Sequence, residues 1–251
     1  MNHDLQLALE LADASDAITL RHFHSSSLGV RTKSDHTPVS EADEAVERSI
    51  RERLAKERPG DGIVGEEFGS SPGQRRWIID PIDATKNYIR GIPVFATLIA
   101  LEERGMITVG VVSSPAMSLR WWAARGEGAF RNGSRIHVSK VAAIDEAHLS
   151  YDSVIDFDMH GLAVQFLALA RRCSRTRAFG DFWSYMLVAE GAIDIAIEPQ
   201  VALWDMAPIS IIVEEAGGRF TDLRGIARAD GGSGVATNGI LHDAVLSALA
   251  K

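Results

Sequence analysis

The stretch WIIDPIDATKN, residues 77–87, decides how the rest of this sequence is interpreted. Its apolar beginning predicts a buried strand, and Pro81 is expected to stop that strand because its ring fixes φ and removes a backbone donor. Asp80 and Asp83 then share one tight turn, and a helical turn is expected to start over 83–85. Two carboxylates on one turn suit Mg²⁺, and free N–H groups at a helix start suit a phosphate. A simple helix cap after a strand would give the same pattern, so other acidic residues must decide.

Composition and charge exclude several classes of protein. The 251 residues are 46% hydrophobic, which allows a packed core in one large domain or in two fused sub-domains. A net charge of −8, without clustered Lys and Arg, argues against a nucleic-acid partner. Cys173 is the single cysteine, so no internal disulfide can form and a cytoplasmic location is expected. The sequence begins without the pattern of a secretion signal, and no apolar run reaches the roughly 18 residues of a membrane span.

Hydrophobic periodicity predicts a mixed α/β chain. Helices are expected over 4–23, 41–57, 160–172, 182–190, 204–216 and from 241. Strands are expected over 30–33, 63–65, 77–79, up to 177, and over 193–197, 219–221 and 234–237, with an antiparallel meander over 94–130. We expect residues 1–140 to form a metal-binding half with two helices and an antiparallel sheet. Residues 141–251 then form an α/β half that completes the active site and the substrate pocket within one compact unit.

Three acidic groups lie at predicted element boundaries: Gly65-Glu66-Glu67, the Asp80 to Asp83 turn, and Trp204-Asp205. Asp43 adds a fourth acid, three residues beyond Ser40, the expected N-cap of the second helix. With these motifs in this order, the sequence closely resembles the inositol monophosphatase family of Mg²⁺-dependent phosphatases. The family signatures are G-E-E, D-P-[IL]-D-G-[TS] and W-D-x-[AS], and the resemblance covers nearly the whole chain. It implies a layered α-β-α-β-α sandwich and a homodimer.

The resemblance also implies a set of metal ligands and a reaction. A phosphate monoester resists attack because its anionic oxygens repel nucleophiles, so two or three Mg²⁺ ions are needed to neutralise charge and activate water. By resemblance, the ligands are the Ile82 carbonyl and the carboxylates of Glu66, Asp80, Asp83 and Asp205.

Further roles follow from the same resemblance. Thr85 and Asp43 are expected to orient and deprotonate the attacking water, while the N–H groups of Ala84 and Thr85 face the phosphate. Glu66 and Asp205 are also expected to lie next to the substrate. Ala84 departs from the family pattern, which has glycine at this position. We expect Ala84 to adopt a helical conformation, where its Cβ is tolerated.

Substrate choice is expected to depend on the second half of the chain. Residues 177–185, RAFGDFWSY, occupy the place of a Gly-Ser/Thr-Ala-Ala type stretch in inositol phosphatases, so Asp181 replaces a small residue. With Arg177, Gly180 and Glu198, it is a candidate for substrate binding. An acidic, aromatic pocket suits a cationic group better than neutral hydroxyls, although these aromatic residues also suit plain helix packing.

This stretch and residues 120–126 are similar to the histidinol-phosphatase branch of the family, in the histidine pathway of actinobacteria. L-histidinol phosphate is therefore the expected substrate. Two alternatives stay open. The first is another phosphatase of this fold, acting on inositol phosphates, sugar bisphosphates or 3′-phosphoadenosine 5′-phosphate. The second is a non-catalytic phosphate or metal sensor, for which Ala84 is the only indication.

Overall fold

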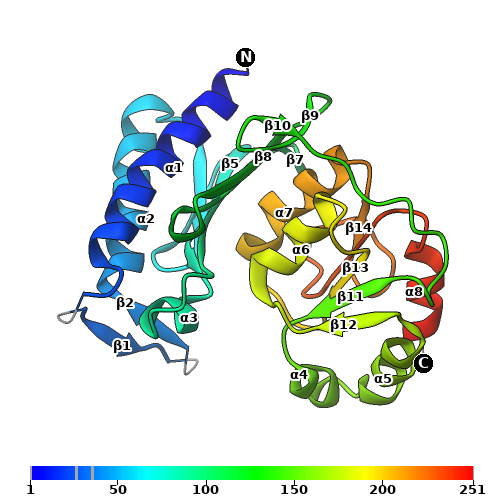
Figure 1. Ribbon diagram of the computed structural model, residues 1–251. Helices are drawn as coiled ribbons and strands as arrows, with labels where there is room; N and C mark the ends of the chain where they lie inside the picture. The colour runs from blue at the N-terminus through cyan, green and yellow to red at the C-terminus, as the bar shows by residue number, and fades with distance from the viewer. Residues whose placement is uncertain (1, 26–27, 35–36, 251) are drawn as a thin grey trace.

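The computed structural model describes residues 2–25, 28–34 and 37–250, and it shows five layers of secondary structure (Figure 1). The first layer is the helix pair α1 (His3–His22) and α2 (Glu41–Glu57), which packs on an eight-stranded sheet. A hairpin of β1 (Val30–Thr32) and β2 (Pro38–Ser40) joins the two helices. The layered α-β-α-β-α sandwich expected from the sequence is confirmed.

The first sheet has the strand order β10-β9-β8-β7-β6-β5-β3-β4. Its strands are β3 (Gly62–Gly65), β4 (Gly69–Ser71), β5 (Arg75–Asp83), β6 (Ala96–Glu103), β7 (Met106–Ser114), β8 (Leu119–Ala124), β9 (Gly128–Arg131) and β10 (Ser134–Arg135). All neighbours pair antiparallel except β3 and β5. Two short helices lie in the connections between its strands: α3 (Thr85–Ile89) follows β5, and the 3₁₀ turn η1 (Pro115–Met117) follows β7. The predicted antiparallel meander is confirmed.

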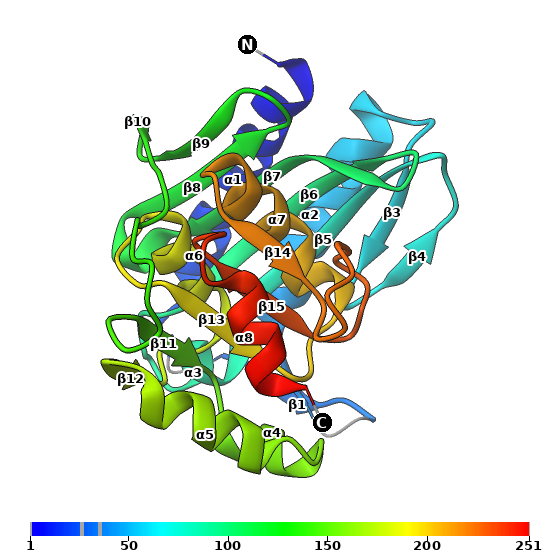
Figure 2. The same ribbon diagram turned by 90° about the vertical axis from the view of Figure 1, so that its right-hand side faces the viewer.

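The middle layer and the second sheet come from the C-terminal half (Figure 2). The middle helices are α6 (Asp181–Ala189) and α7 (Leu203–Glu215). The second sheet has the order β12-β11-β13-β15-β14, with β11 (His148–Tyr151), β12 (Arg175–Arg177), β13 (Ile195–Glu198), β14 (Arg219–Thr221) and β15 (Gly234–Thr237). Its outer face is covered by α5 (Ala163–Arg172) and α8 (His242–Leu249), and α4 (Val154–Met159) precedes α5.

The core is continuous from the first sheet through the middle helices to the second sheet. Leu98 and Trp121 of the first sheet belong to the same buried cluster as Ile209 of α7 and Phe220 of β14. The buried run from Met206 to Val213 on α7 therefore packs between both sheets. None of the helices in the described ranges is both long and apolar enough to cross a membrane.

Most predicted elements are present, and the differences are local. The helix over 41–57 is confirmed with its cap, because the Ser40 and Asp43 side chains bond reciprocally with the first turn of α2. The strand β11 and the helix α4 were not predicted, and a break at residues 160–162 separates α4 from α5, so the helix predicted over 160–172 begins only at Ala163. The break has a physical reason: Gly161 has φ of 66°, which a continuous helix excludes.

Candidate active site

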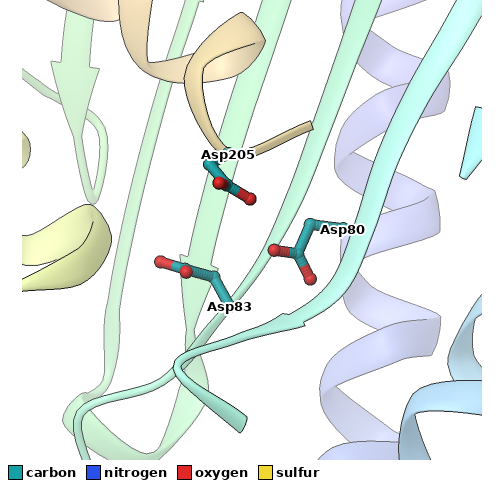
Figure 3. Close-up of side chains that lie close together, drawn as sticks. All are labelled: Asp80, Asp83 and Asp205. Carbon is teal, nitrogen blue, oxygen red and sulfur yellow. The ribbon is translucent and has the colours of Figure 1, made fainter. Parts of the chain in front are cut away.

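Three carboxylates converge where the strand β5 ends and the helix α7 begins (Figure 3). One oxygen each from Asp80, Asp83 and Asp205 lies within 4.8 Å of the other two. β5 continues past Pro81 to Asp83, so the expectation that Pro81 stops the strand is wrong. The register against β6 shifts between Asp80 and Asp83, and Pro81 lies in this irregular stretch, where its missing donor costs little. Asp205 is the third residue of α7, and its Oδ2 accepts a 2.7 Å hydrogen bond from the Ala202 N–H.

Among the described residues, no positive charge is a main influence on the pKa of any of these three carboxylates. Burial, followed by the charge of Glu66, raises the pKa of Asp80 well above its ordinary value, and burial and Asp181 do the same for Asp83. Burial also raises the pKa of Asp205 to about 7. The buried Oδ1 of Asp80 has no hydrogen-bond partner among the described residues. A hard divalent cation is the partner that such oxygen ligands suit.

Glu66 and Ile82 line the same cavity as these three carboxylates, so the structure brings the whole predicted ligand set together. The cavity has a volume of about 470 Å³. Lys33, which follows β1, reaches into this region, and its Nζ lies 2.8 Å from Glu66 and 2.6 Å from Glu67. Sequence reasoning missed Lys33, because a lone lysine in a polar loop carries no recognisable signal.

Asp43 and Thr85, the expected pair for water activation, are in contact. The Thr85 hydroxyl lies 3.2 Å from Asp43 Oδ1 and 2.9 Å from the Ile82 carbonyl oxygen, so its single proton can be donated to either. The other oxygen of Asp43 accepts a 2.9 Å bond from the Ser40 N–H. Burial raises the pKa of Asp43 to about 6, which leaves the carboxylate largely ionised above neutral pH.

The expectation for Ala84 is wrong. Its φ of 66° and ψ of 44° place it in the left-handed region rather than in a helical conformation. The chain must leave the irregular end of β5 and enter α3 within one residue, and the left-handed geometry makes this turn possible. The Ala84 carbonyl then accepts bonds from the N–H groups of Asn87 and Tyr88. Ala84 lines the cavity, as predicted from its position.

A second cavity of about 250 Å³ adjoins the first and contains the candidate substrate residue Asp181. Its walls also include Thr85, Lys86 and Asp152. Asp181 begins α6 with φ of 47°, and its Oδ2 accepts a long, 3.4 Å bond from the Asn87 side chain. Burial, and then the charge of Asp152, raises the pKa of Asp181 to about 7. This cavity is therefore an anionic compartment next to the proposed metal site.

Glu198 is buried at the end of β13, with 7% of its surface exposed. Its Oε1 has no hydrogen-bond partner in the described part of the chain. Burial and the neighbouring charge of Asp181 raise the pKa of Glu198 well above its ordinary value. Glu198 and Asp181 are thus electrostatic neighbours, but Glu198 is not among the described residues that line the two cavities.

Arg177 does not join this group. Its exposed side chain lines a separate cavity with Phe179 and Leu187, and it donates a 2.8 Å bond to the Thr176 carbonyl. Its prediction as a substrate residue is not supported, because β12 ends there and the chain turns toward α6 only afterwards. Gly180, in contrast, lies near the site: with φ of 73°, a Cβ there would be 2.6 Å from Asp152 Oδ1.

Two acids of the cavity walls were missed by sequence reasoning. Asp152 follows β11, a strand that was not predicted, and lines the second cavity. Asp156 belongs to α4 and lines the first cavity. Because neither β11 nor α4 was predicted, neither acid could be recognised in the sequence as lying at an element boundary. Phe182 and Tyr185 are fully buried in the core, which confirms the packing interpretation of these two aromatic residues.

The comparisons with known proteins agree with this fold and site. The model of the inositol monophosphatase family matches residues 1–251, so the chain belongs to this family. A histidinol-phosphatase of Mycobacterium tuberculosis is 54% identical, with 99% of each chain covered. A histidinol-phosphatase of Streptomyces coelicolor is 51% identical and covers 98% of this chain and 96% of its own. An extragenic suppressor protein of Bartonella henselae superposes with a TM-score of 0.92 at 31% identity, covering 100% of this chain and 99% of its own.

Proposed function

We propose that the protein is a Mg²⁺-dependent phosphatase that hydrolyses L-histidinol phosphate to L-histidinol and phosphate in cytoplasmic histidine biosynthesis. The observation that carries the proposal is the convergence of Asp80, Asp83 and Asp205 beside a second, anionic cavity that holds Asp181. The names of the relatives at 54% and 51% identity support the choice of substrate. We further propose a homodimer from the family resemblance, to be tested by light scattering.

The residues present fit Mg²⁺. We propose that the carboxylates of Glu66, Asp80, Asp83 and Asp205 and the Ile82 carbonyl hold two or three ions, because all five residues line one cavity and Asp80 Oδ1 has no other partner among the described residues. When bound, Mg²⁺ neutralises the phosphate oxygens, lowers the pKa of water and stabilises the leaving alkoxide.

Asp43 and Thr85 provide the proton acceptor of the proposed reaction. Asp43 accepts the Thr85 proton, which leaves the hydroxyl oxygen with a free lone pair toward the cavity. A water molecule placed there donates to Thr85 and is oriented for attack on phosphorus. The proton that this water donates to Thr85 can pass through the Thr85 hydroxyl to Asp43, whose pKa of about 6 suits a base at neutral pH. The N–H groups of Ala84 and Thr85 are proposed to face the phosphate.

Asp181 and Glu198 are proposed to select the alcohol part of the substrate. Histidinol carries an ammonium group and a titratable imidazole, so an anionic wall favours it over a polyol of neutral hydroxyls. Substrate binding then lowers the raised pKa of Asp181, because the cation compensates the burial and the neighbouring charge of Asp152.

The test is phosphate release from histidinol phosphate, inositol 1-phosphate and fructose 1,6-bisphosphate at one Mg²⁺ concentration, with and without chelator. We expect Mg²⁺-dependent turnover with a clear preference for histidinol phosphate. A preference for either other ester would assign the chain to another phosphatase activity of this fold. No turnover of any ester, with Mg²⁺ still bound, would leave the non-catalytic sensor.

A further inference from the structure

The helix α2 carries two fully buried carboxylates one turn apart, Asp43 and Glu47, and only Asp43 has a role so far. Side chains at i and i+4 share one face of a helix. Asp43 contacts Thr85, whereas Glu47 contacts the turn after β3 that contains Glu66. We propose that Glu47 is a positioning residue that fixes Glu66 for the metal, an inference that rests on the Mg²⁺ site of the proposed function.

The Glu47 carboxylate bonds to the backbone on the far side of Glu66. Its Oε2 accepts a 2.8 Å bond from the Glu67 N–H, and its Oε1 accepts a 3.2 Å bond from the Phe68 N–H. Arg51, one turn further along α2, donates to Glu47 Oε1 at 2.7 Å and also donates to the Gly69 carbonyl. The residues that follow Glu66 are therefore held from the side of α2.

The residues on the near side of Glu66 are held by the sheet. Gly65 pairs with Ile79 of β5 in parallel register, and the Glu66 N–H donates a 3.2 Å bond to the Ile79 carbonyl. Figure 2 shows β3 beside β5. Glu66 is thus the residue between a strand anchor and a helix anchor. A loss of the bonds from α2 would therefore change the position of Glu66.

Gly65, the residue before Glu66, leaves room for the Glu47 carboxylate. A Cβ built on Gly65 would overlap the Glu47 carboxylate, with Oε1, the carboxyl carbon and Oε2 as its three nearest atoms. Gly65 has an ordinary negative φ, so steric room rather than backbone freedom requires glycine here. A buried carboxylate without partners would be strongly destabilising, and two backbone N–H groups and one guanidinium compensate this cost.

Glutamine at position 47 has the same side-chain shape as glutamate, but its NH₂ group is a donor. This NH₂ group would face a backbone N–H, which is also a donor. One N–H of the turn then loses its acceptor, and the turn that carries Glu66 relaxes. Substitutions of residues that orient metal ligands weaken metal binding by roughly ten- to a hundredfold. Glu47→Gln should therefore weaken Mg²⁺ binding by about tenfold. The kcat at saturating Mg²⁺ should change little, because Asp43, Thr85 and Asp181 keep their own contacts and bound Mg²⁺ holds Glu66 in place.

The experiment is calorimetric titration of the whole protein with MgCl₂, without substrate. Wild type, Glu47→Gln, Glu47→Asp and the control Glu52→Gln are compared, since Glu52 is an exposed acid on the same helix. Glu47→Asp keeps the charge with a shorter reach, so its loss of affinity should be smaller than that of Glu47→Gln. Glu52→Gln should bind Mg²⁺ like wild type. The half-saturating Mg²⁺ for phosphate release should move in parallel, at constant KM for the ester.

The results separate this inference from the proposed function. Unchanged Mg²⁺ affinity in a folded Glu47→Gln protein, with only a lower Tm, would make Glu47 a simple packing residue and overturn the inference. If Glu47→Gln does not fold, unchanged affinity in Glu47→Asp has the same meaning. Failure of wild type to bind Mg²⁺ would instead overturn the metal site and this inference with it. Normal Mg²⁺ binding without histidinol-phosphate turnover would contradict only the substrate assignment.

Discussion

The two walls of the active site reach it by different routes. On one wall, Asp80 and Asp83 belong to a single strand end. On the other, Asp152 follows β11 and Asp181 begins α6, two elements that only the tertiary fold brings together. A short motif can therefore define the first wall, whereas the second wall depends on where two separate elements lie. The Asp80 to Asp83 part of the proposed metal site is local in sequence, whereas Asp205 and the proposed substrate residues come from other elements.

The walls also differ in the charge that each one needs. The Asp80, Asp83 and Asp205 group has raised pKa values, and the oxygen Asp80 Oδ1 has no partner among the described residues, so it needs a bound cation. Asp181 already has a nearby cation, Lys86, whose charge lowers its pKa in part. The first wall should respond to Mg²⁺, and the second wall should respond to the charge on the substrate.

The largest expected effect is on the first wall. Asp83→Asn removes one anionic ligand and should abolish phosphate release, with a loss of more than about a hundredfold. Its backbone contact should persist, because an amide oxygen can still accept the 2.8 Å bond from the Phe182 N–H. Asp158→Asn, which changes an exposed acid on α4, should keep full activity. Normal turnover by the Asp83→Asn protein would contradict the assignment of this wall to the metal.

A second prediction concerns the pH dependence of stability without metal. Acids whose folded pKa is raised destabilise the fold while ionised, and this cost disappears as pH falls through the folded pKa. With chelator, the Tm should therefore rise between pH 8.5 and pH 6.5, on the order of 5 °C for about 2 kcal/mol. Asp205, with a pKa of about 7, titrates in this window. Bound Mg²⁺ should remove the trend.

The window ends at pH 6.5 for a reason. Burial lowers the pKa of His242 to about 4, so below pH 6.5 the unfolded chain takes up a proton that the folded chain does not. This effect destabilises the fold as pH falls and would oppose the signal of the acids. A Tm that falls from pH 8.5 to pH 6.5 in chelator would show that ionisation of the buried carboxylates does not destabilise the fold.

The third prediction addresses the second wall. Asp181→Asn should reduce kcat/KM for histidinol phosphate by roughly ten- to a hundredfold, equivalent to about 1–3 kcal/mol. Asparagine tolerates the left-handed φ of 47° as well as aspartate does, so the start of α6 should not change. Turnover of inositol phosphate should stay the same or improve, because the removed charge had no partner there. An equal loss on both esters would mean that Asp181 supports the loop only.

The sequence predicted the parts of this molecule that local rules determine. The bounds of α2, β14 and β15 agree, because capping, turn chemistry and periodicity act over a few residues. The family resemblance is confirmed, and the ligand set converges in one cavity. Arg177 lines another cavity although the end of β12 at 177 was predicted, because the cavity that a strand end faces depends on the tertiary fold; Asp152 was missed because the strand β11 was not predicted.

Ala84 is the exception on the first wall, because its conformation depends on the irregular pairing of β5 with β6. For an L-residue the left-handed region costs roughly 1–2 kcal/mol, whereas glycine adds only about 0.5–1 kcal/mol of unfolded-state entropy. Ala84→Gly should therefore stabilise the protein by about 0.5–1 kcal/mol, the opposite of what a helical residue would give. The rate should hold or rise, since the substitution removes a methyl group from the cavity.

The matched control uses the same substitution at a helical position. Ala55 is exposed in α2, so Ala55→Gly should lower stability by about 0.5–1 kcal/mol through the helix propensity of glycine. Two alanine-to-glycine changes with opposite signs in thermal unfolding would establish that backbone strain is stored at the turn between Asp83 and α3. Equal losses at both positions would place Ala84 in an unstrained conformation and remove the one departure from local rules on this wall. The sign of the difference is thus informative even where its size is small, because both variants share the same change in unfolded-state entropy.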